Sequence, residues 1–332
     1  MTSVGYEGTA IVAATGERSR LRLFPVSFFA VVMGLAGFAI AVQRAETILG
    51  LPSGAGHVLG WMALAVFALI AALYTLKLVR HPNDVLKELA HPIKLSFFPA
   101  ISIGLILLSI AVRGTSSTLA FILLSVGAPL QLLLTLFVLS RWITHTTFEI
   151  HHSNPSWFIP VVGNILVPLA AVDLGLVEVA WFFFSVGLVF WIVLQTIVLN
   201  RVIFHAPLPA KLAPTFFILM APPAVGFIAY VKLTGAVDGF ARILLYTALF
   251  TALLLLALYR KFIGLKFFLS WWAYSFPVAA LAIASMLMHS VTGFTFFAVL
   301  GWVLLALLTA IIFGLVARTL KAIRAGEICV EE

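Results

Sequence analysis

The spacing of the charged residues is the feature that most constrains this sequence. Nine stretches contain no Lys, Arg, Asp or Glu, and each is long enough to cross a bilayer, which takes about 20 apolar residues in a helix. They are 23–43, 47–76, 95–112, 114–140, 150–172, 179–200, 212–231, 243–259 and 267–317. The last stretch is long enough for two spans, with a turn at residues 289–293. The sequence therefore predicts an all-α integral membrane protein with ten transmembrane helices, whose charged residues lie at or beyond the span ends.

Basic residues are distributed unevenly between the two faces of the predicted bundle. All but four of the 20 Lys and Arg residues fall in the two tails and in the loops that follow even-numbered spans. The other face has only Arg44, Arg113, Lys232 and Arg242. Because basic loops stay in the cytoplasm, we expect a multi-pass protein of the plasma (bacterial inner) membrane with both termini cytoplasmic. This asymmetry accounts for the formal net charge of +8 without a nucleic-acid partner, and it leaves open a role in gathering anions.

Proline distinguishes the odd-numbered spans from the even-numbered ones. Short turns on the less basic face pair the spans into five helical hairpins, and such internal repeats are typical of membrane transport proteins. Eight prolines fall in the odd spans and one, Pro129, in the even spans. Proline removes a helical hydrogen bond, and a carbonyl freed in lipid needs a partner. We therefore expect kinked odd helices inside, lining a central pore, and straight even helices facing lipid.

The odd spans also carry much of the small and polar inventory inside the membrane. The candidate pore-lining or helix-kink residues are Gly34, Pro99, Pro160, Gly163, Asn164, Pro222, Ser275 and Pro277. Asn164 is the most polar of them, and we expect its side chain to face the pore or to bond a carbonyl freed by a nearby proline. The plainer alternative is that Pro and Gly are common in membrane helices and permit close packing.

Residue patterns that carry catalysis or bind a metal are not visible in the sequence. His151 and His152 lie beside Glu149, but adjacent side chains point apart and no fourth ligand is evident. A nucleophilic serine elbow, an HExxH helix and a glycine-rich phosphate loop are also missing. The single cysteine, Cys329, allows no internal disulfide. We therefore expect no enzyme, no cofactor and no metal site.

The start of the ninth span combines aromatic residues with a proline. Trp271 and Trp272 fit a belt at the membrane interface, whereas Phe276 and Pro277 lie deeper. The residue before a proline is biased away from helical geometry, so we expect the Phe276 ring to leave the regular helix track. A bulky ring in a narrow apolar pore gates by excluding water. The alternative is that Phe276 packs between helices.

Short motifs along the chain resemble those of the tellurite-resistance/C4-dicarboxylate transporter family, which includes bacterial TehA and the plant guard-cell slow-type anion channels. The motifs are Phe24-Pro25 with Gly34, residues 91–94 leading into Phe97-Phe98, residues 154–156, residues 162–164, Ala221-Pro222 and residues 272–277. The resemblance implies a quasi-fivefold bundle of hairpins, a central pore in each protomer, a gating phenylalanine matching Phe276, a homotrimer, and permeation of anions. The resemblance covers about residues 24–318. From the spans and the basic loops we expect a cytoplasmic tail at 1–22, a ten-helix channel domain at 23–318 and a second cytoplasmic tail at 319–332.

Two functions are compatible with these features. The first is a passive anion channel or facilitator for small inorganic anions such as chloride and nitrate, with an uncharged pore and poor selectivity. The second is a proton-coupled carrier of C4-dicarboxylates such as malate, or an exporter of tellurite or sulfite. Proton coupling normally needs an ionisable relay inside the membrane, and the spans contain none. A channel passes unitary current, whereas a carrier saturates and depends on the pH gradient.

Overall fold

The computed structural model describes residues 20–144 and 148–329, which fold into α-helices and short 3-10 helices with no β-strand among them. Ten helical spans in these residues are long and apolar enough to cross a membrane, as the sequence predicts. They are Val26–Ile48, Ala55–Arg80, Lys94–Val112, Ser117–Thr144, Pro155–Leu174, Val177–Phe204, Ala210–Thr234, Gly239–Ala257, Leu269–Thr292 and Thr295–Arg324. Most of the tail predicted at 1–22, and the last residues of the second tail, lie outside the described residues.

Each even-numbered span is one α-helix from end to end. These helices are α2 (Ala55–Arg80), α5 (Ser117–Thr144), α8 (Val177–Phe204), α10 (Gly239–Ala257) and α12 (Thr295–Arg324). Helix α5 continues through its proline, Pro129. Helix α12 continues to Arg324, beyond residue 318, where the sequence analysis ends the channel domain.

Each odd-numbered span instead begins with 3-10 helix and then becomes α-helical. The segments are η2 (Val26–Phe28) and α1 (Phe29–Ile48); η3 (Lys94–Phe97) and α4 (Ala100–Val112); η5 (Pro155–Trp157), α6 (Phe158–Val162), η6 (Gly163–Leu166), α7 (Pro168–Ala171) and η7 (Val172–Leu174); η8 (Ala210–Met220) and α9 (Ala221–Thr234); η10 (Leu269–Tyr274) and α11 (Ser275–Thr292). Hydrogen bonds in a 3-10 helix are poorer, and such stretches inside a longer helix often mark a functional hinge. Prolines fall at the start of α4, α7, α9 and α11, where the helix type changes, whereas Pro160 lies inside α6 and Pro214 inside η8.

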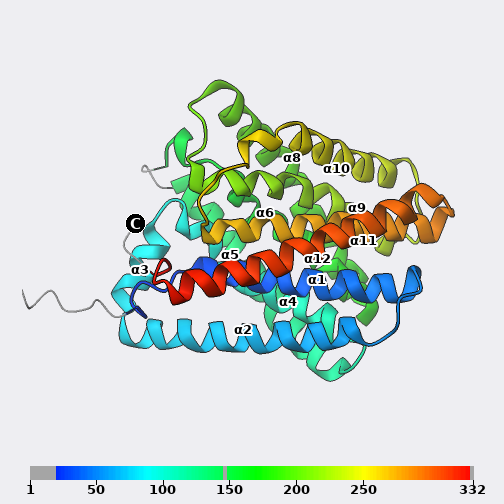
Figure 1. Cartoon of the computed structure of the whole chain (residues 1–332), viewed down its shortest axis with the longest axis horizontal. Coiled ribbons are helices and arrows are strands. Elements are labelled where there is room, and N and C mark those ends of the chain that lie inside the picture. The colour runs from blue at the N-terminus through cyan, green and yellow to red at the C-terminus, as the bar shows by residue number, and fades with distance from the viewer. Residues whose placement is uncertain (1–19, 145–147, 330–332) are drawn as a thin grey trace, which may run out of the picture.

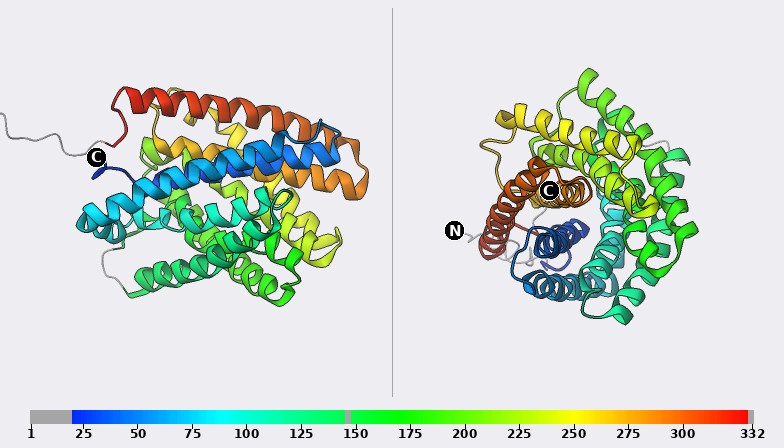
Figure 2. Two further views of the ribbon diagram at one scale, coloured as in Figure 1. Left: turned by 90° about the horizontal axis from the view of Figure 1, so that it is seen from below. Right: turned by 90° about the vertical axis from the view of Figure 1, so that its right-hand side faces the viewer.

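The odd spans lie inside the bundle and the even spans cover them. Between 67% and 83% of the most apolar window of each odd span is buried, against 22% to 33% for each even span. Long helices such as α1, α2, α11 and α12 run along the long axis of the molecule (Figure 1). An end-on view shows α1 and α11 on the inner side of α2 and α12 (Figure 2, right). The even spans therefore form the outer layer of the bundle, and the odd spans form its interior.

The two described ends of the chain meet at one end of the bundle, which we call the tail end (Figure 1). A Cβ added at Gly326 would lie 3.5 Å from the Arg20 guanidinium. The opposite end, the far end, holds the short turns between the odd and even spans. One of these turns is the predicted one after the ninth span, where Gly293 ends α11 with a φ of 72°, a conformation that favours glycine.

A buried ion pair joins three elements at the tail end. Lys77 of α2 is one of the basic residues that the sequence analysis assigns to the loops after even-numbered spans, and its side chain is only 1% exposed. Its Nζ lies 3.1 Å from Oε1 of Glu88 in α3 (Pro82–Ala90) and donates to the Phe24 carbonyl at 2.8 Å. The Tyr74 hydroxyl donates to the second Glu88 oxygen at 2.8 Å. A buried pair needs such additional hydrogen bonds, so this cluster fixes α3 against α2 and the first span.

Candidate functional site

The ninth span changes from 3-10 helix to α-helix at Ser275. Just before this point Trp272 is buried, and its indole nitrogen donates to the Thr319 hydroxyl of α12 at 3.0 Å. The Ser275 hydroxyl donates back to the Trp272 carbonyl at 2.6 Å. Pro277 is the third residue of α11, and a proline in the first turn breaks no helical hydrogen bond. Phe276 is therefore an ordinary helical residue, and the expectation that Pro277 pushes it out of helical geometry is wrong.

Two glycines of α1 allow the start of α11 to approach closely. A Cβ added at Gly34 would lie 2.3 Å from the Ser275 Oγ and 2.8 Å from the Trp272 ring. One added at Gly37 would lie 3.1 Å from Cδ2 of the Phe276 ring. The Phe276 ring thus rests against bare backbone of α1, and the rest of the ring is partly accessible.

A cavity of about 40 Å³, the far-side cavity, extends from Phe276 toward the far end. All five odd spans contribute to its wall, and its wall residues include none from an even span. They are Gly37, Ile40, Arg44, Leu107, Ile110, Leu166, Leu169, Val225, Ile228, Lys232, Phe276, Ala280 and Ile283. Within each span these residues are three or four apart, so each helix presents a single face. The wall is apolar except for Arg44 and Lys232.

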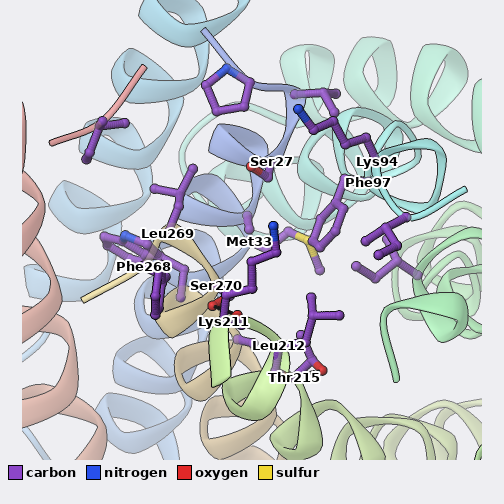
Figure 3. Close-up of a pocket in the computed structure, with 18 of the residues that line it drawn as sticks. Ser27, Met33, Lys94, Phe97, Lys211, Leu212, Thr215, Phe268, Leu269 and Ser270 are labelled. Carbon is purple, nitrogen blue, oxygen red and sulfur yellow. Dashed lines mark hydrogen bonds between the residues drawn. The ribbon is translucent and has the colours of Figure 1, made fainter. Parts of the chain in front are cut away.

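A larger cavity of about 240 Å³, the tail-side cavity, lies on the other side of Phe276. Lys94, at the start of η3, and Lys211, near the start of η8, contribute basic side chains to its wall from different elements (Figure 3). The chain after α12 also reaches it, with Glu327 and Cys329 in the wall. Basic groups therefore line this cavity near the tail end, while its deeper wall is largely apolar.

Phe276 lines both cavities, and the two sets of wall residues share no other member. The ring therefore stands between a tail-side and a far-side space that follow one another along the same five spans. Both spaces contain fixed cations, so the expectation of an uncharged pore holds only for the apolar stretch on either side of Phe276. Arg44 is the clearest departure, because α1 extends past residue 43, where the charge-free stretch ends, to Ile48.

All but one of the other predicted site residues lie outside the walls of the two cavities. Pro277 lines the tail-side cavity, whereas neither cavity is lined by Gly34, Pro99, Pro160, Gly163, Asn164, Pro222 or Ser275. A Cβ added at Gly163 would lie 2.5 Å from Ile103, so this glycine permits contact between the fifth and third spans. The Pro99 carbonyl accepts a hydrogen bond from Ser102 at 2.9 Å. Pro222 is buried in the first turn of α9.

A buried polar network connects α5 to the fifth span. The Pro160 carbonyl accepts hydrogen bonds from Gln131 Nε2 at 3.0 Å and from the Thr135 hydroxyl at 2.6 Å. Asn164 is fully buried, and its Nδ2 donates to Thr135 at 2.9 Å and to the Val161 carbonyl at 2.7 Å. Asn164 therefore bonds a backbone carbonyl and faces neither cavity. Gln131 and Thr135 escaped the sequence analysis, although two polar residues one turn apart in a charge-free span are a detectable signal.

Ten membrane spans and two basic cavities in series define a membrane transport protein that suits anions. The family described as voltage-dependent anion channel, SLAC1, matches residues 23–320, and the chain belongs to this family. The resemblance inferred from the short motifs is thereby confirmed. The family is one of channels and transporters rather than enzymes.

Individual relatives come from plants, archaea and bacteria. The S-type anion channel SLAH3 of Arabidopsis thaliana is 30% identical over 308 residues, covering 90% of this chain and 48% of SLAH3. The uncharacterized transporter MJ0762 of Methanocaldococcus jannaschii is 25% identical over 336 residues, covering 94% and 98%. The tellurite resistance protein TehA homolog of Haemophilus influenzae is 27% identical over 260 residues, covering 78% and 79%. The chain spans about half the length of the plant relatives SLAH3 and SLAH2.

Proposed function

We propose that this protein is an anion channel or facilitator that passes small inorganic anions, such as chloride and nitrate, through a pore gated by Phe276. The observation that carries the proposal is the position of Phe276 as the residue common to both cavities. Its ring interrupts a path whose walls are apolar on both sides, and an apolar constriction blocks ions by excluding water. Removing the ring joins the two cavities.

The proposed pore runs between the five odd helices of five hairpins in quasi-fivefold arrangement. The wall of the far-side cavity supports this arrangement, because each odd span gives it one helical face. Fixed cations at both ends of the path attract anions and repel cations, with Lys94 and Lys211 at the tail end and Arg44 and Lys232 at the far end. The apolar stretch between them binds ions weakly, so ions leave as readily as they arrive.

The orientation and assembly follow from the basic loops and from the family. We place the tail end, with both termini, in the cytoplasm because most Lys and Arg residues fall in its tails and loops. We also propose a homotrimer in which each protomer has its own pore. The protein mass of the purified protein–detergent complex, measured by light scattering, should equal three chains of 36.0 kDa each; a mass of one chain contradicts it.

The competing proposal is a proton-coupled carrier of malate or an exporter of oxyanions such as tellurite, as the name of the Haemophilus influenzae relative suggests. A carrier requires flux that saturates and depends on the pH gradient. A channel requires a reversal potential that follows the anion gradient and is indifferent to pH. Reversal potentials of purified protein in planar bilayers, under chloride, nitrate and malate gradients, separate the two.

The gate is tested by truncating the ring. Phe276→Ala should raise the anion current about tenfold or more, since lowering a barrier by ~1.4 kcal/mol already gives a factor of ten. Phe276→Leu should raise it less because it retains apolar bulk. Phe250→Ala is the matched control, since Phe250 is a 66% exposed phenylalanine of α10.

Two results would contradict the proposed role of Phe276 as a gate. A folded Phe276→Ala protein whose current equals that of the unaltered protein contradicts the gate and favours a purely packing role. An equal rise in Phe250→Ala contradicts it as well, because Phe250 lies on an even helix away from the path. Thermal unfolding of each variant in detergent establishes that it is folded before currents are compared.

A further inference from the structure

Arg44 and Lys232 form a cationic cluster at the far end of the far-side cavity. Gly37 touches the Phe276 ring, and Arg44 lies seven residues further along α1, which is about 10 Å at 1.5 Å per residue. Lys232 is likewise near the far end of α9. The two cations therefore face the part of the path that is furthest from Phe276.

An acid offsets one of these cations but not the other. Asp173 Oδ2 lies 2.6 Å from Lys232 Nζ, and the same oxygen pairs with the Arg113 guanidinium. Lys232 Nζ also donates to the Leu169 carbonyl at 2.5 Å. Arg44 is exposed and, within the described part of the chain, forms no ion pair, while its charge and that of Arg113 act on Lys232. Lys232 and Arg113 thus share the Asp173 carboxylate, while the wall of the far-side cavity holds Arg44 and Lys232 and no acid.

The size and lining of the cavity restrict what this charge can hold. A cavity needs about 10–15 Å³ for each water-sized group, so about 40 Å³ accommodates only a few such groups. The apolar wall of the cavity lowers the dielectric inside it and strengthens the attraction of the two cations for an anion that enters. Chloride and nitrate fit these limits, whereas a four-carbon dicarboxylate carries many more heavy atoms than the cavity admits.

We propose that Arg44 is the anion-capturing residue at the outer mouth of the pore, with Lys232 as a second cation whose charge is partly held by Asp173. The site takes a small monovalent inorganic anion and passes it to the apolar stretch beside Phe276. The direction in which the anion moves, from the outer mouth toward Phe276, rests on the proposed function. The site itself is defined by the cavity and its charges, so it is testable by binding alone.

Conduction is measured in the Phe276→Ala background, with about 10 mM or about 1 M chloride on the outer side. Arg44→Gln should reduce the current carried by outer chloride about tenfold at low salt, the lower end of what electrostatic focusing supplies. The reduction should disappear at 1 M, where the Debye length falls to about 3 Å. Arg44→Lys should retain the current, and Asp173→Asn should raise it by freeing Lys232.

Arg242→Gln is the matched control. Arg242 lies on the same face of the protein but on α10, and it lines neither cavity. An unchanged current in Arg44→Gln, an equal loss in Arg242→Gln, or an equal loss in a folded Arg44→Lys overturns the capture site.

Chloride binding is measured separately from conduction. A protein that binds chloride at this site but conducts no current can then be recognised. The thermal midpoint of the purified protein is compared in sodium chloride and in sodium gluconate at equal ionic strength. Chloride should raise it in the Phe276→Ala protein and not in Phe276→Ala with Arg44→Gln. Silent bilayers with this chloride effect reject the proposed function and retain the site, whereas equal midpoints in both proteins reject the site.

Discussion

Gly34 of α1 lies directly against Ser275 of α11, so closely that a Cβ on Gly34 would come within 2.3 Å of the Ser275 hydroxyl oxygen. Both residues are buried, and the same Cβ would lie 2.8 Å from the Trp272 ring. This contact sets how near the helix that carries Phe276 comes to the first span. The geometry of the proposed gate therefore depends on a glycine that lines neither cavity.

Replacing this glycine should separate the two helices. Gly34→Ala should lower the free energy of unfolding by about 1–3 kcal/mol, the usual cost of overpacking a tight interior. It should also raise the basal anion current, since α11 and the Phe276 ring move away from α1. Gly314→Ala on α12 is the control, because a Cβ there meets nothing within 4 Å. Equal stability of Gly34→Ala and Gly314→Ala would show that the close contact has no energetic consequence.

Removing one partner of the buried ion pair at the tail end should strongly lower the free energy of unfolding. Lys77→Met leaves the Glu88 carboxylate buried, with the Tyr74 hydroxyl as its remaining side-chain donor in the part of the chain that the structure describes. Breaking a buried pair in this way costs about 3–5 kcal/mol. Lys87→Met, which removes a 74% exposed lysine 3.7 Å from Asp84, should cost less than about 1 kcal/mol. Chemical unfolding in detergent measures both, and similar losses in the two variants contradict this reading.

The polar network of the fifth span makes a different prediction. Asn164→Leu removes the donor to Thr135 and to the Val161 carbonyl in a fully buried setting, at a cost of about 1–3 kcal/mol. Because Asn164 lines neither cavity, conductance in the Phe276→Ala background should stay unchanged. Thr196→Val is the control, since Thr196 is an exposed residue of α8 that bonds only its own helix at Ile192. A changed conductance with unchanged stability would place Asn164 in the ion path instead.

The spans were predictable because their signals are local. Charge-free length identifies a membrane helix without knowledge of its neighbours, and the separation of prolines into odd spans agrees with the burial of those spans. The sequence also singles out Phe276, an aromatic residue beside Pro277, and this residue lines both cavities; its role as a gate stays a prediction. The helical geometry of Phe276 was not predictable from the sequence. The cost of a proline depends on whether it falls in the first turn of a helix, and the residue at which α11 begins is set by packing.

The charges of the path were missed for a related reason. The sequence analysis ends the first span at residue 43, the last residue before a charge, whereas α1 continues through Arg44 to Ile48. The spacing of Gly37, Ile40 and Arg44, three and then four residues apart, is the signal that places Arg44 on the cavity face. The sequence analysis counts Lys77 with the loop residues and does not pair it with Glu88, which comes from a separate helix. Such pairings become visible only in three dimensions.

The last prediction concerns Cys329, the single cysteine, which lines the tail-side cavity. Burial raises the pKa of its thiol above the ordinary value, outweighing the opposing effect of Lys77 and Arg20. The thiolate is the reactive form, and a raised pKa means that less of it is present at any given pH near neutrality. Labelling by an impermeant thiol reagent should therefore be slow at neutral pH and should accelerate at a higher pH than for an exposed cysteine. If the tail end is cytoplasmic, the reagent should reach Cys329 only from the cytoplasmic side.

The control is Ser53→Cys in a Cys329→Ser background. Ser53 is exposed in the turn between α1 and α2 at the far end, so it should be labelled only from outside and with an ordinary pH profile. Labelling of Cys329 from outside sealed, intact cells contradicts the orientation. Matching pH profiles for the two cysteines contradict the burial of Cys329 in the cavity wall, because only a desolvated thiol titrates late. The side of labelling and its pH dependence are independent readouts. A protein inserted in the opposite orientation would still show labelling that accelerates only at high pH. An exposed Cys329 would still report the side of the membrane on which it lies.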